Sequence, residues 1–294
     1  MDIFVSFGDM ITGTLGIKAD TKKSDIGVYF IKISETMKVV KGKLGEILEQ
    51  NGKYEKVKSK VEEFIEQIGK IEEGAEEAAK GANGTDAIGN AVKDQEAVPA
   101  DVASINSLVK GIKGIVGVVL KKDEGNAEAT KTGDTEQKSI GKLFSSKKDT
   151  DGTEAQAAAV GATIGAVSGA DILQAIVKSG EATSEAKIET ANDAANIAAA
   201  KVEESKSLNA AKKDAVIAGG IVLRAMGKAG KFVAKKDEDK SVFAINGAVA
   251  SAVNKVLSTL VIAIRNKVDE GLKEINEVLG EIKQGENPVS KFSE

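Results

Sequence analysis

The sequence predicts an all-α protein, with a bundle of long helices and with shorter helices and loops in the middle of the chain. Three observations carry this prediction. Apolar residues recur at alternating steps of four and three, which places them on one face of a helix. The 294 residues include only two prolines, so long helices can run without interruption. Alternation of apolar and polar residues with a period of two, which is typical of half-buried strands, is nearly absent.

The N-terminal part of the chain is expected to form a hairpin of two long helices. In residues 25–51 the apolar stripe has Ser24 or Asp25 as the N-cap and Gly52 after the last turn. A second stripe occupies residues 57–71, and both helices mix lysine with glutamate on their polar faces. Because the turn between them is short, the two helices should pack antiparallel. The apolar positions of the first stripe are Ile26, Phe30, Ile33, Met37, Val40, Leu44 and Ile47.

Further helices are expected downstream. They occupy residues 105–119, 153–178, 192–205, 214–234 and 241–284. The first of them follows two start signals, Pro99 and Asp101. The second has Gly161, Gly165 and Gly169 four residues apart, so one of its faces carries almost no side chains. Such a face predicts close contact with another helix.

The last of these helices contains the most apolar long stretch of the sequence, residues 242–264. Asn246, Asn254 and Lys255 interrupt this stretch, whereas a membrane span needs about 20 cleaner apolar residues. We therefore interpret the segment as a core helix. A homodimer formed by helix–helix contact would use the same apolar surface equally well.

Polar stretches rich in Gly, Asp, Lys and Thr separate the helices and are expected to be loops. They are residues 81–97, 121–137, 147–153, 178–185 and 235–240. Residues 1–294 are expected to form a single helical domain. Its parts are an N-terminal tether and first helix in 1–24, the hairpin in 25–80, shorter helices and variable loops in 81–240, a long closing helix in 241–284 and a tail in 285–294.

The composition argues against an enzyme. The chain has no histidine, no cysteine and no tryptophan, and these absences remove the usual general base, the thiolate nucleophile and the common soft metal ligands. Arg224 and Arg265 are its only arginines, whereas proteins that read nucleic acids depend on arginine for bidentate contacts. We therefore expect no catalytic residues, no metal, no cofactor and no nucleic-acid partner.

Two motifs come near to known ligand sites without completing them. No Gly-Lys pair is followed by Ser or Thr, so the phosphate-binding P-loop pattern is missing. Asp149-Thr150-Asp151-Gly152 is similar to the start of a calcium loop, but the later acidic ligands are missing. A solvated turn is the better interpretation of this segment.

One stretch, residues 212–236, is denser in positive charge than the rest of the chain. Its basic residues are Lys212, Lys213, Arg224, Lys228, Lys231, Lys235 and Lys236. If Arg224, Lys228 and Lys231 share one helix face, they could bind a polyanion such as a host glycosaminoglycan. The plainer interpretation, which we favour, is an amphipathic helix with an ordinary lysine face.

The same stretch also carries a family resemblance. AVIAGGIVLRAMGKAGKFVAKK (215–236) resembles the invariable segment of the variable major surface lipoproteins of Borrelia. KKSDIGVYF (22–30), SGADILQAIVKSGE (168–181) and INGAVASAVNKVL (245–257) resemble that family's first helix, central signature and closing helix. The combination is specific, and it resembles the variable large proteins of relapsing-fever spirochaetes, which are related to the VlsE antigen of Lyme spirochaetes.

The resemblance implies a non-enzymatic surface lipoprotein of the outer membrane that takes part in antigenic variation by gene conversion. In this family the lipid is on an N-terminal cysteine, which this sequence lacks together with a visible signal peptide. The long helices would lie near the membrane and the variable loops would face outward, toward host antibodies. The family has no catalytic residues to carry over.

Two other functions remain open beside this one. The first is a host-ligand adhesin that uses the basic stretch 212–236, and the second is a cytosolic helical structural protein. On the scaffold-and-loop interpretation, replacing residues 121–137 with an unrelated polar segment should leave the helical circular dichroism and the cooperative melting intact, because loops tolerate such changes.

Overall fold

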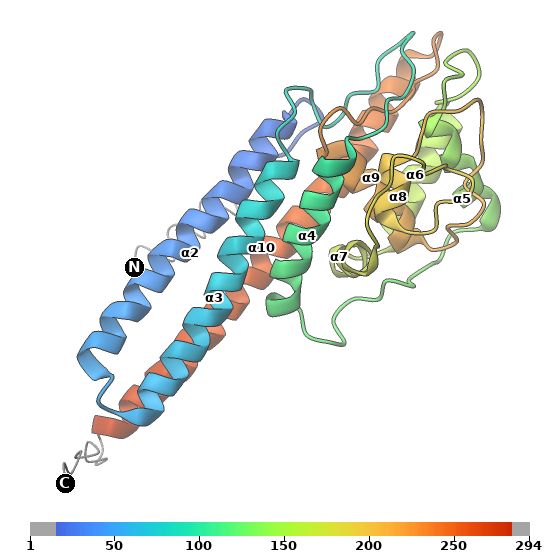
Figure 1. Ribbon diagram of the computed structural model, residues 1–294. Helices are drawn as coiled ribbons and strands as arrows, with labels where there is room; N and C mark the ends of the chain where they lie inside the picture. Colours follow the sequence, from blue (N-terminus) through green and yellow to red (C-terminus); the bar gives the residue numbers. More distant parts are fainter. Residues whose placement is uncertain (1–15, 284–294) are drawn as a thin grey trace.

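The computed structural model describes residues 16–283, in which long helices run side by side and short helices cluster against one end (Figure 1). The long helices are α2 (Lys23–Asn51), α3 (Glu55–Gly81) and α10 (Asp239–Lys283), and α4 (Val102–Val119) packs along α3. The short helices are α5 (Asp134–Ile140), a 3₁₀ turn η1 (Gly141–Phe144), α6 (Glu154–Ala166), α7 (Gly169–Lys178), α8 (Ala194–Ala199) and α9 (Asp214–Met226). The predicted all-α class is confirmed.

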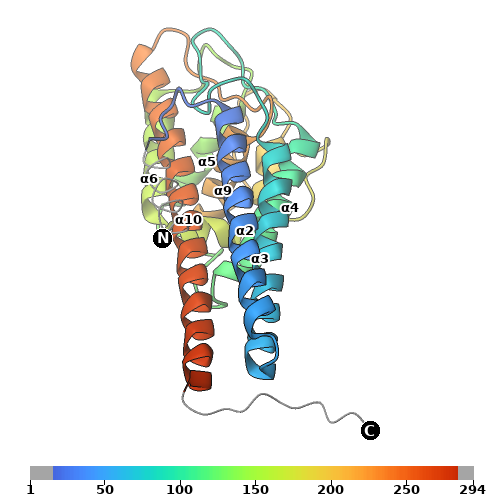
Figure 2. The same cartoon turned by 90° about the vertical axis from the view of Figure 1, so that its left-hand side faces the viewer.

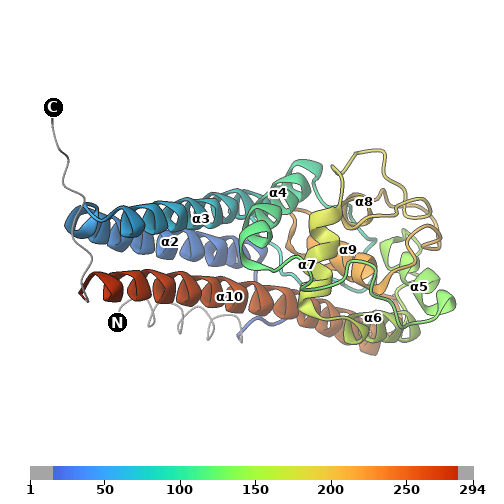
Figure 3. The ribbon, with the colours of Figure 1, turned by 90° about the horizontal axis from the view of Figure 1, so that it is seen from below.

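The two ends of the molecule differ in construction. The α2–α3 turn and the end of α10 form one end, which we call the long-helix end (Figure 3). The other, the short-helix end, holds α5 to α9 and the connections that precede α4 and α10 (Figures 2 and 3). These two connections meet through isolated bridges, in which Val92 pairs with Val233 and Val98 with Lys231. Within residues 16–283 such bridges take the place of strands.

The predicted hairpin is confirmed, and its apolar stripe lies inside the protein. Phe30, Ile33 and Met37 of α2 are fully buried, as are the facing positions of α3. The helix begins at Lys23, slightly earlier than predicted, because Asp25 acts from the third position of the first turn. Its carboxylate accepts the backbone N–H of Lys22 at 3.1 Å. The expected first 15 residues of the tether and the tail after Lys283 lie outside the described residues.

A close backbone contact joins α3 and α4, away from the glycines that the sequence singled out. Gly161 and Gly165 face open space, and among that trio only Gly169 is pressed against a neighbour, α10. In α3 and α4, by contrast, a Cβ placed on Gly111 would overlap the backbone of Gly74 and Ala78. The two helices therefore touch backbone to backbone, which only glycine permits.

The expected helix 153–178 is wrong, because it is broken into α6 and α7, whose axes differ by 97°. Ser168 and Asp171 form a capping box at the start of α7, in which the Ser168 hydroxyl accepts the Asp171 N–H at 3.1 Å. The ammonium of Lys255, on α10, donates to the carbonyls of Ile164 and Val167 at 2.7 and 2.8 Å. The break is thus capped from both sides, by α7 itself and by the long helix beneath it.

Three other boundaries also depart from the prediction. The expected helix 192–205 is reduced to α8, because Lys201 and Glu203 pair instead with Lys187 and Ser145. The expected helix 214–234 stops at Met226. The short helix α5 begins inside the stretch 121–137 that was expected to be a loop.

The apolar character of α10 is explained by the core. Two helices within residues 16–283, Val102–Val119 and Asp239–Glu281, are long and apolar enough to cross a membrane by length and composition. About half of each apolar window, 50% and 56%, is buried inside the protein. Val253, Val256 and Leu260 are fully buried, as the core-helix interpretation requires. These side chains are occupied within one chain, and a homodimer stays a prediction.

Candidate functional surface

The basic stretch 212–236 is built around a helix that is buried, not amphipathic. Every side chain of α9 except Val216 lies inside the protein, and the helix packs against α6, α7, α8 and α10. The amphipathic helix expected over residues 214–234, with its exposed lysine face, is therefore wrong. Basic side chains reach the surface only where the chain enters and leaves α9.

The predicted basic residues consequently form two groups. Lys212 and Lys213 precede α9 and the other lysines follow it, and a 13-residue helix separates the groups by about 20 Å at 1.5 Å per residue. Several of these lysines face carboxylates: Lys213 with Glu128 at 3.8 Å, Lys235 with Glu238 at 2.5 Å and Lys236 with Asp94 at 4.0 Å. Lys231 donates to the side chain of Gln95, and Lys228 is exposed. Polyanion binding by the lysines stays a prediction, but one continuous patch is absent.

Arg224 is not a surface residue, so the prediction that it lies on an exposed basic helix face is wrong. The side chain is fully buried, with its guanidinium 4.7 Å from the ring centre of Phe144 and 5.9 Å from that of Phe232. Its Nε donates to the carbonyl of Lys231 at 3.0 Å, and one terminal nitrogen donates to the carbonyls of Ala198 and Ala200 at 3.0 and 3.2 Å. Burial lowers the pKa of Arg224 to about 9.

Lys23, the first residue of α2, is a second buried cation, which sequence reasoning missed. Its ammonium donates to the carbonyls of Arg224, Gly227 and Gly230, at 3.1, 2.6 and 2.7 Å. The ammonium thus caps the end of α9, since the carbonyls of a last helical turn lack partners within the helix. It also binds two carbonyls of the chain that follows the helix. The pair Lys22-Lys23 gave no signal, because a lysine at a helix start is ordinarily solvated.

Asp214 is a buried anion at the other end of α9. Its carboxylate accepts the backbone N–H groups of Lys131 and Thr132 at 2.6 and 2.9 Å and the side-chain amide of Gln137 at 2.9 Å. The Thr132 hydroxyl also donates to it. Burial acts to raise the pKa of Asp214, but these hydrogen bonds outweigh burial and hold the pKa below its usual value.

These contacts narrow the expectation for residues 121–137. A complete replacement would remove the side-chain partners of Asp214, which are Thr132 and Gln137, so only the exposed part of the stretch is free to change. We expect Asp214→Ala to lower the unfolding free energy by about 2–4 kcal/mol, since the buried amide of Gln137 and the partly buried donors of Lys131 and Thr132 lose their acceptor. Alanine at the exposed Lys122 and Asp123 should change it by less than about 0.5 kcal/mol. Urea unfolding followed by circular dichroism measures both, and equal effects would contradict the role given to Asp214.

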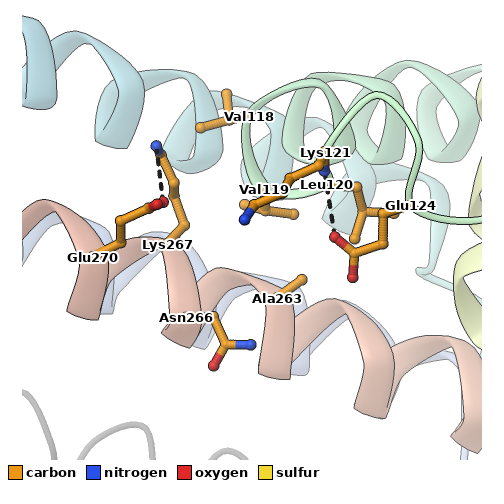
Figure 4. A pocket seen from close by; sticks show the side chains of 9 residues that line it. All are labelled: Val118, Val119, Leu120, Lys121, Glu124, Ala263, Asn266, Lys267 and Glu270. Carbon is orange, nitrogen blue, oxygen red and sulfur yellow. Dashed lines mark hydrogen bonds and ion pairs between the residues drawn. The ribbon is translucent and has the colours of Figure 1, made fainter.

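A groove of about 660 Å³ lies between the end of α4 and α10 (Figure 4). Val118, Val119, Leu120 and Ala263 form its apolar wall, and three of its charged side chains already have partners. Lys267 pairs with Glu270 at 3.6 Å, and Glu124 accepts the backbone N–H of Lys121 at 3.3 Å. Across the described part of the chain no three carboxylates gather as metal ligands. In the calcium-like segment Asp149 is exposed while Asp151 is buried and accepts from Ser205, so these two carboxylates do not share a site.

Comparisons with known proteins identify the family of this chain. A family model described as Borrelia lipoprotein matches residues 1–279. The chain belongs to the Borrelia lipoprotein family. It is 58% identical over 271 residues to Variable large protein 17 of Borrelia hermsii, covering 90% of this chain and 76% of that protein. It is 53% identical over 292 residues to Variable large protein 4 of Borrelia hermsii, covering 97% and 83%.

A solved structure shares the fold of this chain. The variable surface antigen VlsE of Borrelia burgdorferi superposes with a TM-score of 0.79 at 32% sequence identity, over 88% of this chain and 95% of that one. The resemblance drawn from the sequence motifs is therefore confirmed. In this member of the family, the segment that resembles the invariable one, residues 215–236, contains the buried helix α9 of the short-helix end, and its lysines after that helix lie at or near the surface.

Proposed function

We propose that this Borrelia lipoprotein is a non-enzymatic antigen of the outer membrane surface, which contributes to antigenic variation by changing its exposed loops on a preserved helical frame. A lipid on the N-terminal side would anchor it, and host antibodies would be its partners. The observation that carries the proposal is the division within residues 81–240. The helix α9 is buried and is hydrogen-bonded at both of its ends, while stretches such as 121–124 and 183–185 are exposed.

The physical basis is that substitution affects stability differently at exposed loop residues and at buried charged residues. Exposed loop positions away from buried contacts change stability by only about ±0.5 kcal/mol when substituted, so they can vary without loss of the fold. Buried charges such as Arg224 and Asp214 cannot, because their partners would be left unsatisfied. Variation confined to the first group would change what an antibody contacts and leave the frame intact.

An exchange of loops tests the proposal. Residues 121–124 and 183–185 are replaced with the aligned residues of Variable large protein 17, and polyclonal antibodies raised against the native chain are titrated on both proteins. We expect antibody binding to fall while the circular dichroism spectrum and the melting temperature stay unchanged. A matched control replaces exposed lysines of α3, such as Lys58 and Lys70. Equal antibody titres on all three proteins would contradict the proposal.

The proposed location is tested separately. In cells that express the native gene, metabolic labelling with palmitate and digestion of intact cells by an external protease should both affect this protein. An unlabelled protein that resists the protease until the cells are lysed would contradict the anchored surface location.

A further inference from the structure

The outward face of α2 carries apolar side chains that the fold does not use. Val28, Ile31 and Val39 are 48%, 46% and 50% exposed, and they are three of the seven exposed large apolar residues within residues 16–283. They lie on the side of α2 away from its buried stripe, and α2 lies at the front of the molecule in Figure 2. A surface helix ordinarily carries polar residues on its outward face, so this second apolar stripe indicates a contact outside the chain.

The same face also carries a charged residue and a depression. Glu35 lies between Ile31 and Val39, and Gly42 follows one turn later. A Cβ on Gly42 would meet nothing within 4 Å, so there is open space in front of this turn of the helix. Lys38 borders the face with a side chain that is 54% exposed. The face therefore has apolar projections in its first half and an open depression in its second half.

A second copy of the chain matches this face when the two α2 helices pack antiparallel. A twofold axis midway between Ile31 and Gly42 brings Ile31 of each copy over Gly42 of the other. The same axis brings Glu35 of each copy beside Lys38 of the other, which gives two central pairs of opposite charge. Lys38 already pairs with Glu76 of its own chain at 2.7 Å, and its three donors can serve both carboxylates. A parallel pair would instead place Glu35 against Glu35.

We propose that two copies of this chain associate through the outward face of α2, as an antiparallel pair related by a twofold axis. Burial of Ile31 and Val28 against the opposing residues 42–46 would stabilise the pair, and the central ion pairs would fix its register. This surface is separate from the apolar face of α10, which is buried inside each copy. If the chain is anchored as proposed above, the pair would join two membranes, because its copies point in opposite directions. The pairing itself does not depend on that anchor.

Sedimentation velocity of the full chain over a range of concentrations tests the pairing. We expect a dimer that dissociates on dilution. Ile31→Asp should weaken it about tenfold or more, because a carboxylate replaces an apolar side chain that the dimer buries. Ile262→Asp is the matched control, since Ile262 is 48% exposed on α10, and it should leave the dimer unchanged. Glu35→Lys should also weaken the dimer, because it places two lysines side by side.

Single cysteines test the register, because the chain has no cysteine of its own. Ile31→Cys and Gly42→Cys are mixed and oxidised, and intact mass spectrometry identifies the products. We expect a disulfide between the two different variants, since these positions face each other and a disulfide needs a Cα separation of about 4–7 Å. Neither variant should cross-link with itself, because its two cysteines would lie about 16 Å apart along the helices at 1.5 Å per residue.

Three results would overturn the proposal. The first is a chain that stays monomeric at every concentration, and the second is a dimer that Ile262→Asp weakens as much as Ile31→Asp. The third is cross-linking of each variant with itself in place of the mixed product, which would show a parallel pair. All the substituted residues are exposed, so circular dichroism should show that each variant is folded.

Discussion

Replacing Arg224 with alanine is expected to remove about 4 kcal/mol or more of the unfolding free energy. The change leaves a cavity between Phe144 and Phe232, and it leaves the carbonyls of Lys231, Ala198 and Ala200 without their donor. Since domains are stable by about 5–15 kcal/mol, a loss of this size should leave the variant partly unfolded at 37 °C. Urea unfolding at 25 °C measures the effect.

The chain supplies a matched control, because its only other arginine is at the surface. Arg265 pairs with Asp269 at 3.6 Å, and both side chains are about 40% exposed. Arg265→Ala should therefore cost less than about 1 kcal/mol. Arg224→Lys keeps the positive charge but loses the planar fork of donors, so it should fall between the two alanine variants. Similar losses for Arg224→Ala and Arg265→Ala would refute the role of Arg224 as the organiser of this core.

The sequence is sufficient to place the long helices because the residues of their apolar stripes are the residues that become buried. The apolar stripe from Ile26 to Leu44 is fully buried in α2. A helical stripe of that length indicates a helix that packs against the core. Arg224 could not be placed in the same way. Its spacing of four and seven residues from Lys228 and Lys231 indicates an exposed helix face only if the helix continues, and the helix ends at Met226.

Tertiary contacts determine the helix ends and helix contacts that the local sequence pattern did not predict. The end of α9 is set by Lys23, which is about 200 residues away in sequence, and no periodicity reports such a partner. The break between α6 and α7 did have a local signal, in Ser168 followed three residues later by Asp171. It was hidden by the uniform alanine and glycine composition on both sides. The contact of α3 with α4 depends on glycines in two separate helices, so neither helix reveals it alone.

That contact gives the second large expected effect. Gly111→Val should lower the unfolding free energy by about 3 kcal/mol or more, because the new side chain meets backbone atoms and not mobile side chains. Rotation about χ1 cannot relieve an overlap with the Cβ itself, so α3 and α4 must move apart along their length. Thermal and urea unfolding should both detect the loss.

Gly117, on the same helix, is the control, since a Cβ there meets nothing within 4 Å. Gly117→Val should be nearly neutral, and with alanine the two positions should differ in sign. Gly117→Ala should stabilise α4 by up to about 1 kcal/mol through helix propensity, whereas Gly111→Ala should destabilise the protein. If both alanine variants were stabilising, the two helices could not be in backbone contact.

The partner glycine on α3 allows the contact to be tested as a pair. A Cβ on Gly74 would lie 2.8 Å from the Gly111 carbonyl oxygen and 2.9 Å from a side-chain carbon of Ile115. Once Gly111→Val has separated the helices, Gly74→Ala should cost much less than it does alone. The double-mutant cycle should therefore show non-additivity of about 1 kcal/mol or more. Strict additivity would mean that each glycine is required by its own helix and that the backbone contact carries no energy.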